Sequence, residues 1–387
     1  MKKALKYIAI VFGVVAIVGV ALVTEHVVGM ILRNRALERT QVEISGTPVD
    51  NAYNNYCANY IMFYDGAGDL VRIGDKLYYN YYGGYETYGL YEISSEGAKR
   101  IYWDRYVPIL KLPGFEPLLY PIREYDGKLL MNTKLLSDVY GYNEITHERE
   151  LQKTVIQTYR EETQSFEEDA FFCDVADIRG LMYQETSFGF VYESFEGDAL
   201  WVYTEETGAK QIVSEHLCSF YATGELIYYI SDVGKDGPSE LHMFDWSSQT
   251  DTVIRQWTEY SDISQFFIEG NDLVFIAINS AETTQYLYKL DLRNPAQKET
   301  VIYKIDDNDP DALRVWLWNV WNGTAYFCTK AGLTACDLET GVTRVLYDKA
   351  VFNCAIVDDV WVYFVDNRDC LWRVPQSGGE AELVFKL

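Results

Sequence analysis

The sequence holds few of the side-chain combinations that carry out chemistry. Its four histidines stand apart at positions 26, 147, 216 and 242, and none lies in the HxH or HExxH pattern of a zinc hydrolase. The GxSxG elbow of a serine hydrolase does not occur either. With 58 acidic residues some close carboxylate pair is inevitable, so glycoside hydrolysis stays open without positive support. We therefore expect a protein without a cofactor and favour binding over catalysis.

One acidic run has the spacing of a metal loop. Asp307, Asp309 and Asp311 alternate as in a calcium-binding loop. Ala312 stands where such a loop needs its glycine, and Trp318 stands where it needs a bidentate glutamate. A solvated loop explains the run better, so no metal site is predicted.

Acidic and aromatic side chains are better candidates for a binding surface. The acidic stretches 161–169 and 306–311 could contact a cation or a basic partner. Tyrosines between positions 78 and 91 could stack on a sugar or a peptide, although packing inside the fold is their more usual role. The residues that form the predicted binding rim are Asp307, Asp309, Asp311, Glu167, Glu168, Asp169, Tyr82 and Tyr85.

A strand-rich repeat must position any such rim. Its unit is a strand, a tight turn of Gly, Asn or Asp, a second apolar strand, a polar loop and two further strands. Seven copies occur, with turns near 75, 127, 186, 224, 271, 323 and 359, a mean spacing of about 47 residues. That period is typical of four-stranded propeller blades, and the alternation in residues 286–292 indicates strands rather than helices. We predict seven blades, with six as the alternative.

The repeat also predicts strands in two less regular parts of the chain. In the second copy we place the third and fourth strands within residues 140–156. Residues 56–64 look like an additional strand that could pair with the last blade and close the ring.

The strand endings carry a family resemblance. LYEISSEGAKRI, ACDLETGVTRVL and LWRVPQSGGEAEL, at residues 90–101, 335–346 and 371–383, share a strand, a turn containing Gly and a short apolar strand. This frame resembles bacterial TolB-like propellers and the bacterial domains of unknown function likened to the propeller of low-density-lipoprotein-receptor-related proteins. The resemblance covers roughly residues 60–387. It implies a propeller outside the cytoplasm, often joined to an anchor or a binding module, and it supplies no functional residue.

The N-terminal region predicts a membrane anchor. Residues 7–23 form an uncharged apolar run at the short end for a membrane span, and apolar residues could extend it to position 32. Lys2, Lys3 and Lys6 precede the run, which favours a cytoplasmic N-terminus. A cleaved signal peptide is the alternative, with a poor cleavage site near position 20. We predict a cytoplasmic tail at 1–6, a single-pass anchor at 7–23, a stalk at 24–55 and a β-propeller at 56–387.

Charge and cysteine content limit the partners and the covalent chemistry. The net charge is −25, and residues 1–39 hold six basic against two acidic residues, so the remainder carries about −29. Such a field repels nucleic acid, and both solubility and a cationic partner explain it. The seven cysteines form no CxxC pair, so free buried thiols are expected. A disulfide between Cys328 and Cys336, across a predicted hairpin, is the alternative.

The sequence as a whole predicts an all-β, membrane-anchored propeller outside the cytoplasm. Its expected role is to bind a protein or a cell-envelope ligand, which the charge allows to be cationic. The alternative is a cell-envelope enzyme that acts on glycans through carboxylates in the propeller channel. A purely structural component of a membrane complex is a third hypothesis.

Overall fold

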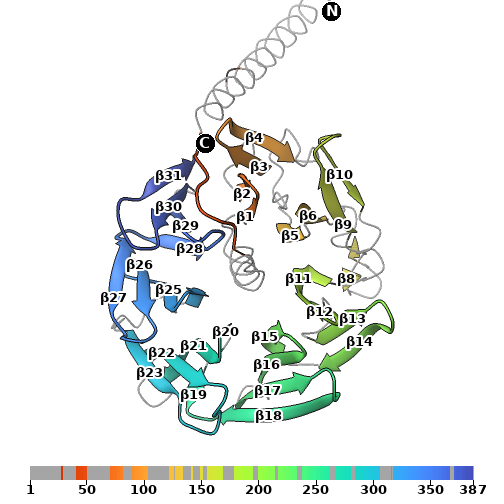
Figure 1. Cartoon of the computed structure of the whole chain (residues 1–387), viewed down its shortest axis with the longest axis vertical. Helices are drawn as coiled ribbons and strands as arrows, with labels where there is room; N and C mark the ends of the chain where they lie inside the picture. Colours follow the sequence, from red (N-terminus) through yellow and green to blue (C-terminus); the bar gives the residue numbers. More distant parts are fainter. Residues whose placement is uncertain are drawn as a thin grey trace, which may run out of the picture.

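The fold is built from seven antiparallel sheets that stand around a central axis (Figure 1). This arrangement confirms the predicted all-β class and the blade number. The computed structural model describes residues 28, 41–49, 70–81, 89–102, 122–125, 127–133, 141–142, 149–150, 155–168, 178–194, 199–213, 217–232, 238–261, 263, 266–279, 284–305, 315, 317–366 and 370–386. Among these residues no helix has the length and the apolar character of a membrane span. The predicted anchor at 7–23 lies outside them.

Each blade is a meander whose strands follow one another from the axis outward. Blade 1 consists of β1 (Leu70–Ile73), β2 (Lys76–Tyr81), β3 (Gly89–Ser94) and β4 (Gly97–Tyr102). Blade 2 consists of β5 (Ile122–Tyr125), β6 (Lys128–Thr133), β9 (Val155–Arg160) and β10 (Ser165–Glu168). Blade 3 consists of β11 (Ile178–Thr186), β12 (Gly189–Ser194), β13 (Leu200–Thr204) and β14 (Gly208–Val213). Blade 4 consists of β15 (Leu217–Thr223), β16 (Leu226–Asp232), β17 (Ser239–Asp245) and β18 (Thr250–Trp257).

The last three blades repeat the plan. Blade 5 adds a short strand to it and consists of β19 (Tyr260–Ser261), β20 (Phe266–Glu269), β21 (Asp272–Asn279), β22 (Thr284–Asp291) and β23 (Thr300–Ile305). Blade 6 consists of β24 (Leu317–Trp321), β25 (Thr324–Thr329), β26 (Gly332–Asp337) and β27 (Thr343–Tyr347). Blade 7 consists of β28 (Val351–Ala355), β29 (Trp361–Asp366), β30 (Leu371–Pro375) and β31 (Glu382–Phe385).

The predicted third and fourth strands of blade 2 were placed wrongly. Of the described residues in 140–156, only Val155 and Ile156 belong to an outer strand of the blade; β7 (Gly141–Tyr142) and β8 (Arg149–Glu150) form a separate two-stranded sheet. The outer strands are β9 and β10, so part of the acidic stretch 161–169 is a strand and part is a turn. The reason is Phe166, whose ring lies 5.1 Å from that of Tyr159 and 5.5 Å from that of Tyr102. One aromatic side chain thus fixes an otherwise polar edge strand.

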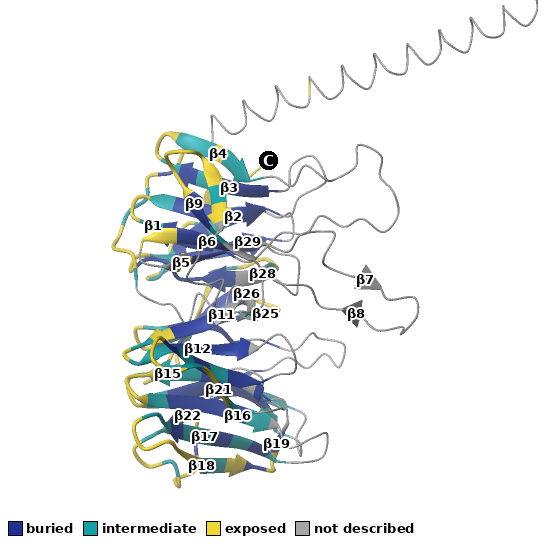
Figure 2. Ribbon diagram, turned by 90° about the vertical axis from the view of Figure 1, so that its right-hand side faces the viewer, coloured by how far each residue is buried: buried dark blue, intermediate teal, exposed yellow. Residues whose placement is uncertain are grey.

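The two faces of the ring differ. Because the strands of a meander alternate in direction, the turn from first to second strand and the turn from third to fourth strand lie at one face, here called the turn face. Figure 2 shows these exposed turns along one side of the molecule, opposite β7 and β8. Asn322 and Gly323 illustrate the local chemistry, since both have positive φ, 48° and 73°, as a tight hairpin requires.

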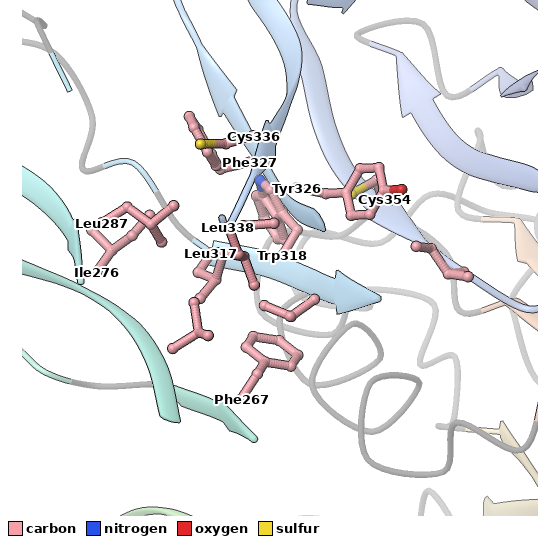
Figure 3. Close-up of a cluster of buried hydrophobic side chains, with 14 of the residues drawn as sticks. Phe267, Ile276, Leu287, Leu317, Trp318, Tyr326, Phe327, Cys336, Leu338 and Cys354 are labelled. Atoms are coloured by element: carbon pink, nitrogen blue, oxygen red, sulfur yellow. The ribbon is translucent and has the colours of Figure 1, made fainter. Parts of the chain in front are cut away.

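The core lies between neighbouring blades. Figure 3 shows Phe267, Leu287, Trp318 and Phe327 meeting where blades 5 and 6 pack together, with Cys354 of blade 7 beyond them. Alternate side chains of each strand point to opposite neighbours, so every sheet is buried on both faces. A single blade could not exclude water in this way, which makes the ring the cooperative unit.

Most of the described tyrosines of blade 1 also belong to this core. Tyr79, Tyr81 and Tyr91 surround Phe385 of blade 7, with ring centroids 5.7, 5.5 and 4.9 Å from it. All three are buried. Packing between blades, rather than ligand stacking, is therefore their role.

A polar side-chain contact accompanies the apolar packing at each of the seven blade junctions. These contacts join a side chain of one blade to a side chain or a backbone group of the next. In order around the ring they are Lys76 with Glu161, Arg123 with Tyr183, Gln184 with Ala222, Arg255 with Glu299, Glu269 with Gly323, Arg344 with Gln376, and Asp358 with Arg72.

The junction between blades 7 and 1 carries an additional segment, residues 41–49, here called the latch. The amide of Val42 donates to the carbonyl of Ser94 in blade 1 at 3.4 Å, and the amide of Val49 donates to the carbonyl of Val357 in blade 7 at 3.3 Å. Asp359 accepts a hydrogen bond from the Thr47 amide at 2.7 Å. The latch therefore bridges the first and last blades from within the region expected as a stalk. The predicted closing strand at 56–64 lies outside the described residues.

A buried arginine fastens the latch. Arg72 of β1 donates to the carbonyls of Ser45 and Gly46 at 3.0 and 2.8 Å, and its Nη1 lies 3.2 Å from Asp358 Oδ2. Asp358 also accepts the hydroxyl of Tyr363 at 2.9 Å. The side chains of Arg72 and Asp358 are 5% and 0% exposed. Because water hardly reaches either charge, each is stabilised by the opposite charge of the other.

The described cysteines are free thiols. Cys328 lies opposite Leu333 and Cys336 opposite Ala325 in the paired strands, so the two cysteines do not face each other. The disulfide alternative is thus wrong. Burial raises the pKa of Cys336 to about 11, which keeps this thiol protonated and unreactive at neutral pH.

Candidate functional site

A groove of about 610 Å³ opens at the turn face, where blade 3 meets blade 4. Its sides are the two hairpin turns of blade 3, and its end is Trp246, which follows β17 of blade 4. Its acidic lining consists of Glu185, Glu205 and Glu206, all exposed. We refer to it as the acidic groove.

Flat aromatic rings form one wall of the acidic groove. The rings of Phe188 and Trp246 are stacked, with centroids 4.9 Å apart and planes 14° from parallel. Both side chains are half-buried, so part of the ring surface stays open to the groove. The amide of Trp246 donates to the carbonyl of Glu225 at 2.8 Å, which ties this ring to the frame of blade 4.

The hairpins that carry the glutamates are held in place by their own threonines. Thr186 Oγ1 accepts the amide of Gly189 at 3.2 Å and donates to the same residue's carbonyl at 2.8 Å. Thr204 Oγ1 accepts the amide of Thr207 at 3.0 Å in the second turn. Gly189 is required here, because a Cβ at its φ of 147° would lie 2.1 Å from the carbonyl oxygen of Tyr203. Glu205 and Glu206 therefore project from a turn that Thr204 stabilises, and Glu185 lies on β11 just before the other turn.

The groove is a negative site with a cation beside it. None of the residues that line it is a lysine or an arginine. Lys210 of β14 does not line the groove, but its Nζ lies 5.7 Å from the centroid of the Trp246 ring and donates to Gln249. A lysine over the face of a tryptophan is a cation–π contact. The arrangement can bind a cation through carboxylates and ring faces together.

A second cluster, on blade 4, has the distances of a catalytic triad. His242 Nε2 lies 3.2 Å from Ser231 Oγ, and His242 Nδ1 lies 3.0 Å from Asp251 Oδ2. Tyr229 stacks on His242 at 4.5 Å and donates to Asp251 at 2.8 Å. Burial, together with the nearby Asp251, raises the pKa of Tyr229.

Within the part of the chain that the structure describes, this cluster has no oxyanion site of the kind that a serine hydrolase needs. Ser231 lies on β16, which is paired on both sides, with β15 and with β17. Backbone amides of a strand that is paired on both sides are largely used in the sheet, so the described part of β16 offers no ready oxyanion site beside Ser231. Glu240 also approaches His242 Nε2 at 3.3 Å and competes for the position that the serine must hold. The cluster is a polar network within the sheet.

We expect Ser231 to remain unmodified when the protein is treated with a fluorophosphonate probe, because the hydroxyl lacks an oxyanion site. Intact-mass spectrometry measures this directly, and chymotrypsin serves as the labelled control. An added mass that disappears in Ser231→Ala would contradict the assignment and make blade 4 a hydrolytic centre.

The predicted binding rim lies mostly outside the described residues. This holds for Tyr82, Tyr85, Asp169, Asp307, Asp309 and Asp311. Glu167 and Glu168 lie on β10, at the outer edge of blade 2. Glu167 is 3.6 Å from Arg160, and Glu161 of the same acidic stretch is 2.8 Å from Lys76. The hydrogen bond from Lys76 lowers the pKa of the Glu161 carboxyl. Glu167 and Glu161 are therefore each paired with a basic side chain of the same protein.

The described innermost strands carry three carboxylates, those of Glu124, Glu185 and Glu269, and Glu185 lines the acidic groove. Glu124 accepts the amide of Gly127 at 2.7 Å and so stabilises its own hairpin. Glu269 accepts the amide of Gly323 at 2.8 and 2.9 Å and so joins blade 5 to blade 6. Among the described residues no group of three or more His, Cys, Asp or Glu side chains could hold a metal ion. The glycan-acting alternative gains no support from this part of the chain.

Comparison with known proteins identifies the architecture. No family model and no curated protein matches the sequence. A solved prolyl endopeptidase is similar at 12% identity with a TM-score of 0.50, covering 85% of this chain and 51% of that one. BamB from Moraxella catarrhalis matches at 9% identity over 88% of both chains with a TM-score of 0.42. TolB from Acinetobacter baumannii matches at 14% identity over 60% of this chain and 65% of that one, with a TM-score of 0.35.

The chain is a seven-bladed β-propeller. TolB and BamB propellers are among its structural neighbours, as the resemblance in the strand endings predicted. At these identities the likeness shows the fold alone, and the propeller spans about half the length of the prolyl endopeptidase.

The acidic groove was not part of the predicted rim. Its signals in the sequence are the pair Glu205-Glu206 in a turn and a tryptophan directly after a strand, both ordinary features alone. What makes them a site is the packing of blade 3 against blade 4, which brings Trp246 to Phe188.

Proposed function

We propose that this propeller is a non-catalytic module that binds a basic segment of a partner protein in the acidic groove. The observation that carries the proposal is the lining itself: three exposed glutamates, two stacked aromatic rings and no basic side chain. Aromatic rings bordered by polar groups are typical of protein recognition sites, since they offer apolar area at little entropic cost.

The charge of the propeller supports a cationic partner. The chain beyond residue 39 carries about −29, and such a field accelerates the approach of a basic protein. Charge far from the contact mainly affects the association rate, so the groove must supply the specificity.

We also propose that residues 7–23 tether the propeller to a membrane and hold it outside the cytoplasm. The support is the uncharged apolar run preceded by Lys2, Lys3 and Lys6. Through the latch, the tether would meet the propeller at the junction of blades 1 and 7.

Site-specific photo-crosslinking in intact cells tests the proposed function. With p-benzoylphenylalanine in place of Thr207, at the edge of the acidic groove, we expect a cross-linked protein whose cross-linked peptide contains arginine or lysine. The matched control is Thr340, an exposed threonine in the corresponding turn of blade 6. We expect no product from that position.

Two results would overturn the proposal. Equal cross-linking from positions 207 and 340 would mean that the groove is not the contact surface. A partner peptide rich in acidic residues would mean that the groove does not select by charge.

A further inference from the structure

The acidic groove combines two kinds of wall that an ordinary acidic patch does not combine. Exposed carboxylates come from the turns of blade 3, and a stacked pair of rings comes from Phe188 and Trp246. We infer that the groove holds an arginine side chain of an extended partner segment, in preference to lysine or a neutral sugar. The inference rests on the proposed function and gives the chemical class of its ligand.

The aromatic wall favours a guanidinium over an ammonium group. A guanidinium is planar and weakly hydrated, so it can stack on the open part of an aromatic face and lose little hydration. An ammonium is compact and strongly hydrated, and it gains less from a flat wall. Phe188 and Trp246 lie 14° from parallel, so each ring covers part of one face of the other, and the guanidinium would stack on ring face that this contact leaves open.

The carboxylates favour the same group. Glu205 and Glu206 are adjacent in one turn, and Glu185 lies in the neighbouring strand β11. The five N–H donors of a guanidinium can reach carboxylates on two sides while the plane of the group stays on the ring. The groove volume of about 610 Å³ also leaves room for the backbone that carries the side chain.

Lys210 shows that the Trp246 ring accommodates a cation. The chain already places its own ammonium 5.7 Å from the centre of the Trp246 ring. This lysine is exposed and is held by Gln249, so it is an intramolecular cation at the border of the groove. A cationic ligand must approach against its charge, whereas a neutral sugar would not be affected.

Peptide titration of the full-length protein in detergent micelles at low salt tests the inference. The probes are three fluorescently labelled pentapeptides, Gly-Ser-Xaa-Ser-Gly, in which the central residue is arginine, lysine or citrulline. We expect arginine to bind more tightly than lysine. Citrulline keeps the shape of arginine without its charge, and we expect it to bind at least about tenfold more weakly than arginine.

Three variants should change the affinity for the arginine peptide in different directions. Glu205→Gln with Glu206→Gln should weaken the arginine peptide by about tenfold, because two attractive charges are removed. Lys210→Met should tighten it by about threefold, because a repulsive charge is removed. Glu339→Gln, an exposed acid in the corresponding turn of blade 6, should leave the affinity unchanged.

The possible results distinguish failure of the arginine inference from failure of the proposed function. Equal binding of arginine and citrulline, or weaker binding in Lys210→Met, would overturn the arginine assignment. If no peptide binds but position 207 still cross-links a basic protein, this inference fails and the proposed function stands. If arginine peptides bind with the expected signs but no partner is cross-linked, the proposed function fails and the ligand class stands.

Discussion

Arg72→Met will lower the free energy of unfolding by about 3–5 kcal/mol, because it leaves Asp358 as a buried charge without its cation. The loss is large because the same side chain also serves two latch carbonyls, those of Ser45 and Gly46. With the arginine removed, both carbonyls lose a donor. Gly46 is exposed, so water can replace the donor there, whereas Ser45 is half-buried. Urea denaturation followed by tryptophan fluorescence measures the change.

A second arginine serves as a control, because its substitution removes a positive charge without leaving a buried carboxylate unpaired. Arg344 also donates to a backbone carbonyl across a blade junction, that of Gln376, but Arg344 is exposed. Arg344→Met should therefore cost less than about 1 kcal/mol. Adding Asp358→Asn to Arg72→Met should recover part of the loss, since it removes the unpaired charge. Equal losses of unfolding free energy in the two arginine variants would show that Arg72 stabilises the fold no more than an exposed arginine does.

Glu299→Ala will have an effect of similar size at the junction of blades 4 and 5. The side chain of Glu299 is 0% exposed and lies 2.9 Å from Arg255 Nη2. It also accepts hydrogen bonds from Trp257 Nε1 at 3.3 Å and from the Tyr260 hydroxyl. Alanine would leave three donors and one positive charge unmatched, at a cost of about 3–5 kcal/mol in unfolding free energy. Glu339→Ala, on an exposed turn, is the control and should be nearly neutral.

The same carboxylate predicts a pH dependence. Burial alone raises the pKa of Glu299, but hydrogen bonds from Tyr260 and Trp257 and the charge of Arg255 outweigh it and hold the pKa below its usual value. A lowered pKa means that the carboxylate stabilises the fold above the pKa of the unfolded chain, and that this stabilisation is lost as pH falls through the folded-state value. The difference in Tm between wild type and Glu299→Gln should therefore shrink between about pH 5 and pH 3. A difference that stays constant over this range would contradict the assignment.

The blade number and most turns were predictable because their causes are local. Asn322-Gly323 has to turn, since both residues adopt positive φ, and the alternation in residues such as 286–292 can only be satisfied by a strand. The sequence-based prediction was wrong where a segment forms a strand against its local strand propensity. β10 reads as an acidic loop, but it pairs with β9, and Phe166 packs on Tyr159 and Tyr102.

The candidate site could not be predicted, because it depends on packing between blades. The density of tyrosines in blade 1 suggested ligand stacking, but Tyr79 and Tyr91 pack against Phe385 of blade 7. The density of acidic residues drew attention to 161–169, where Glu161 pairs with Lys76 of another blade. Trp246 and Phe188 are 58 positions apart in the sequence and meet only in the folded ring.

The latch also has a consequence for how the chain reaches its native state. It joins residues made early in synthesis to residues made late, since Thr47 and Asp359, its hydrogen-bonded pair, are 312 positions apart. Contacts of such separation form slowly, because a very long loop must close before they yield any stabilisation. The early blades would then wait on the ribosome with an open sheet surface until blade 7 is complete. The last step of folding would be the docking of an element that was among the first to be translated.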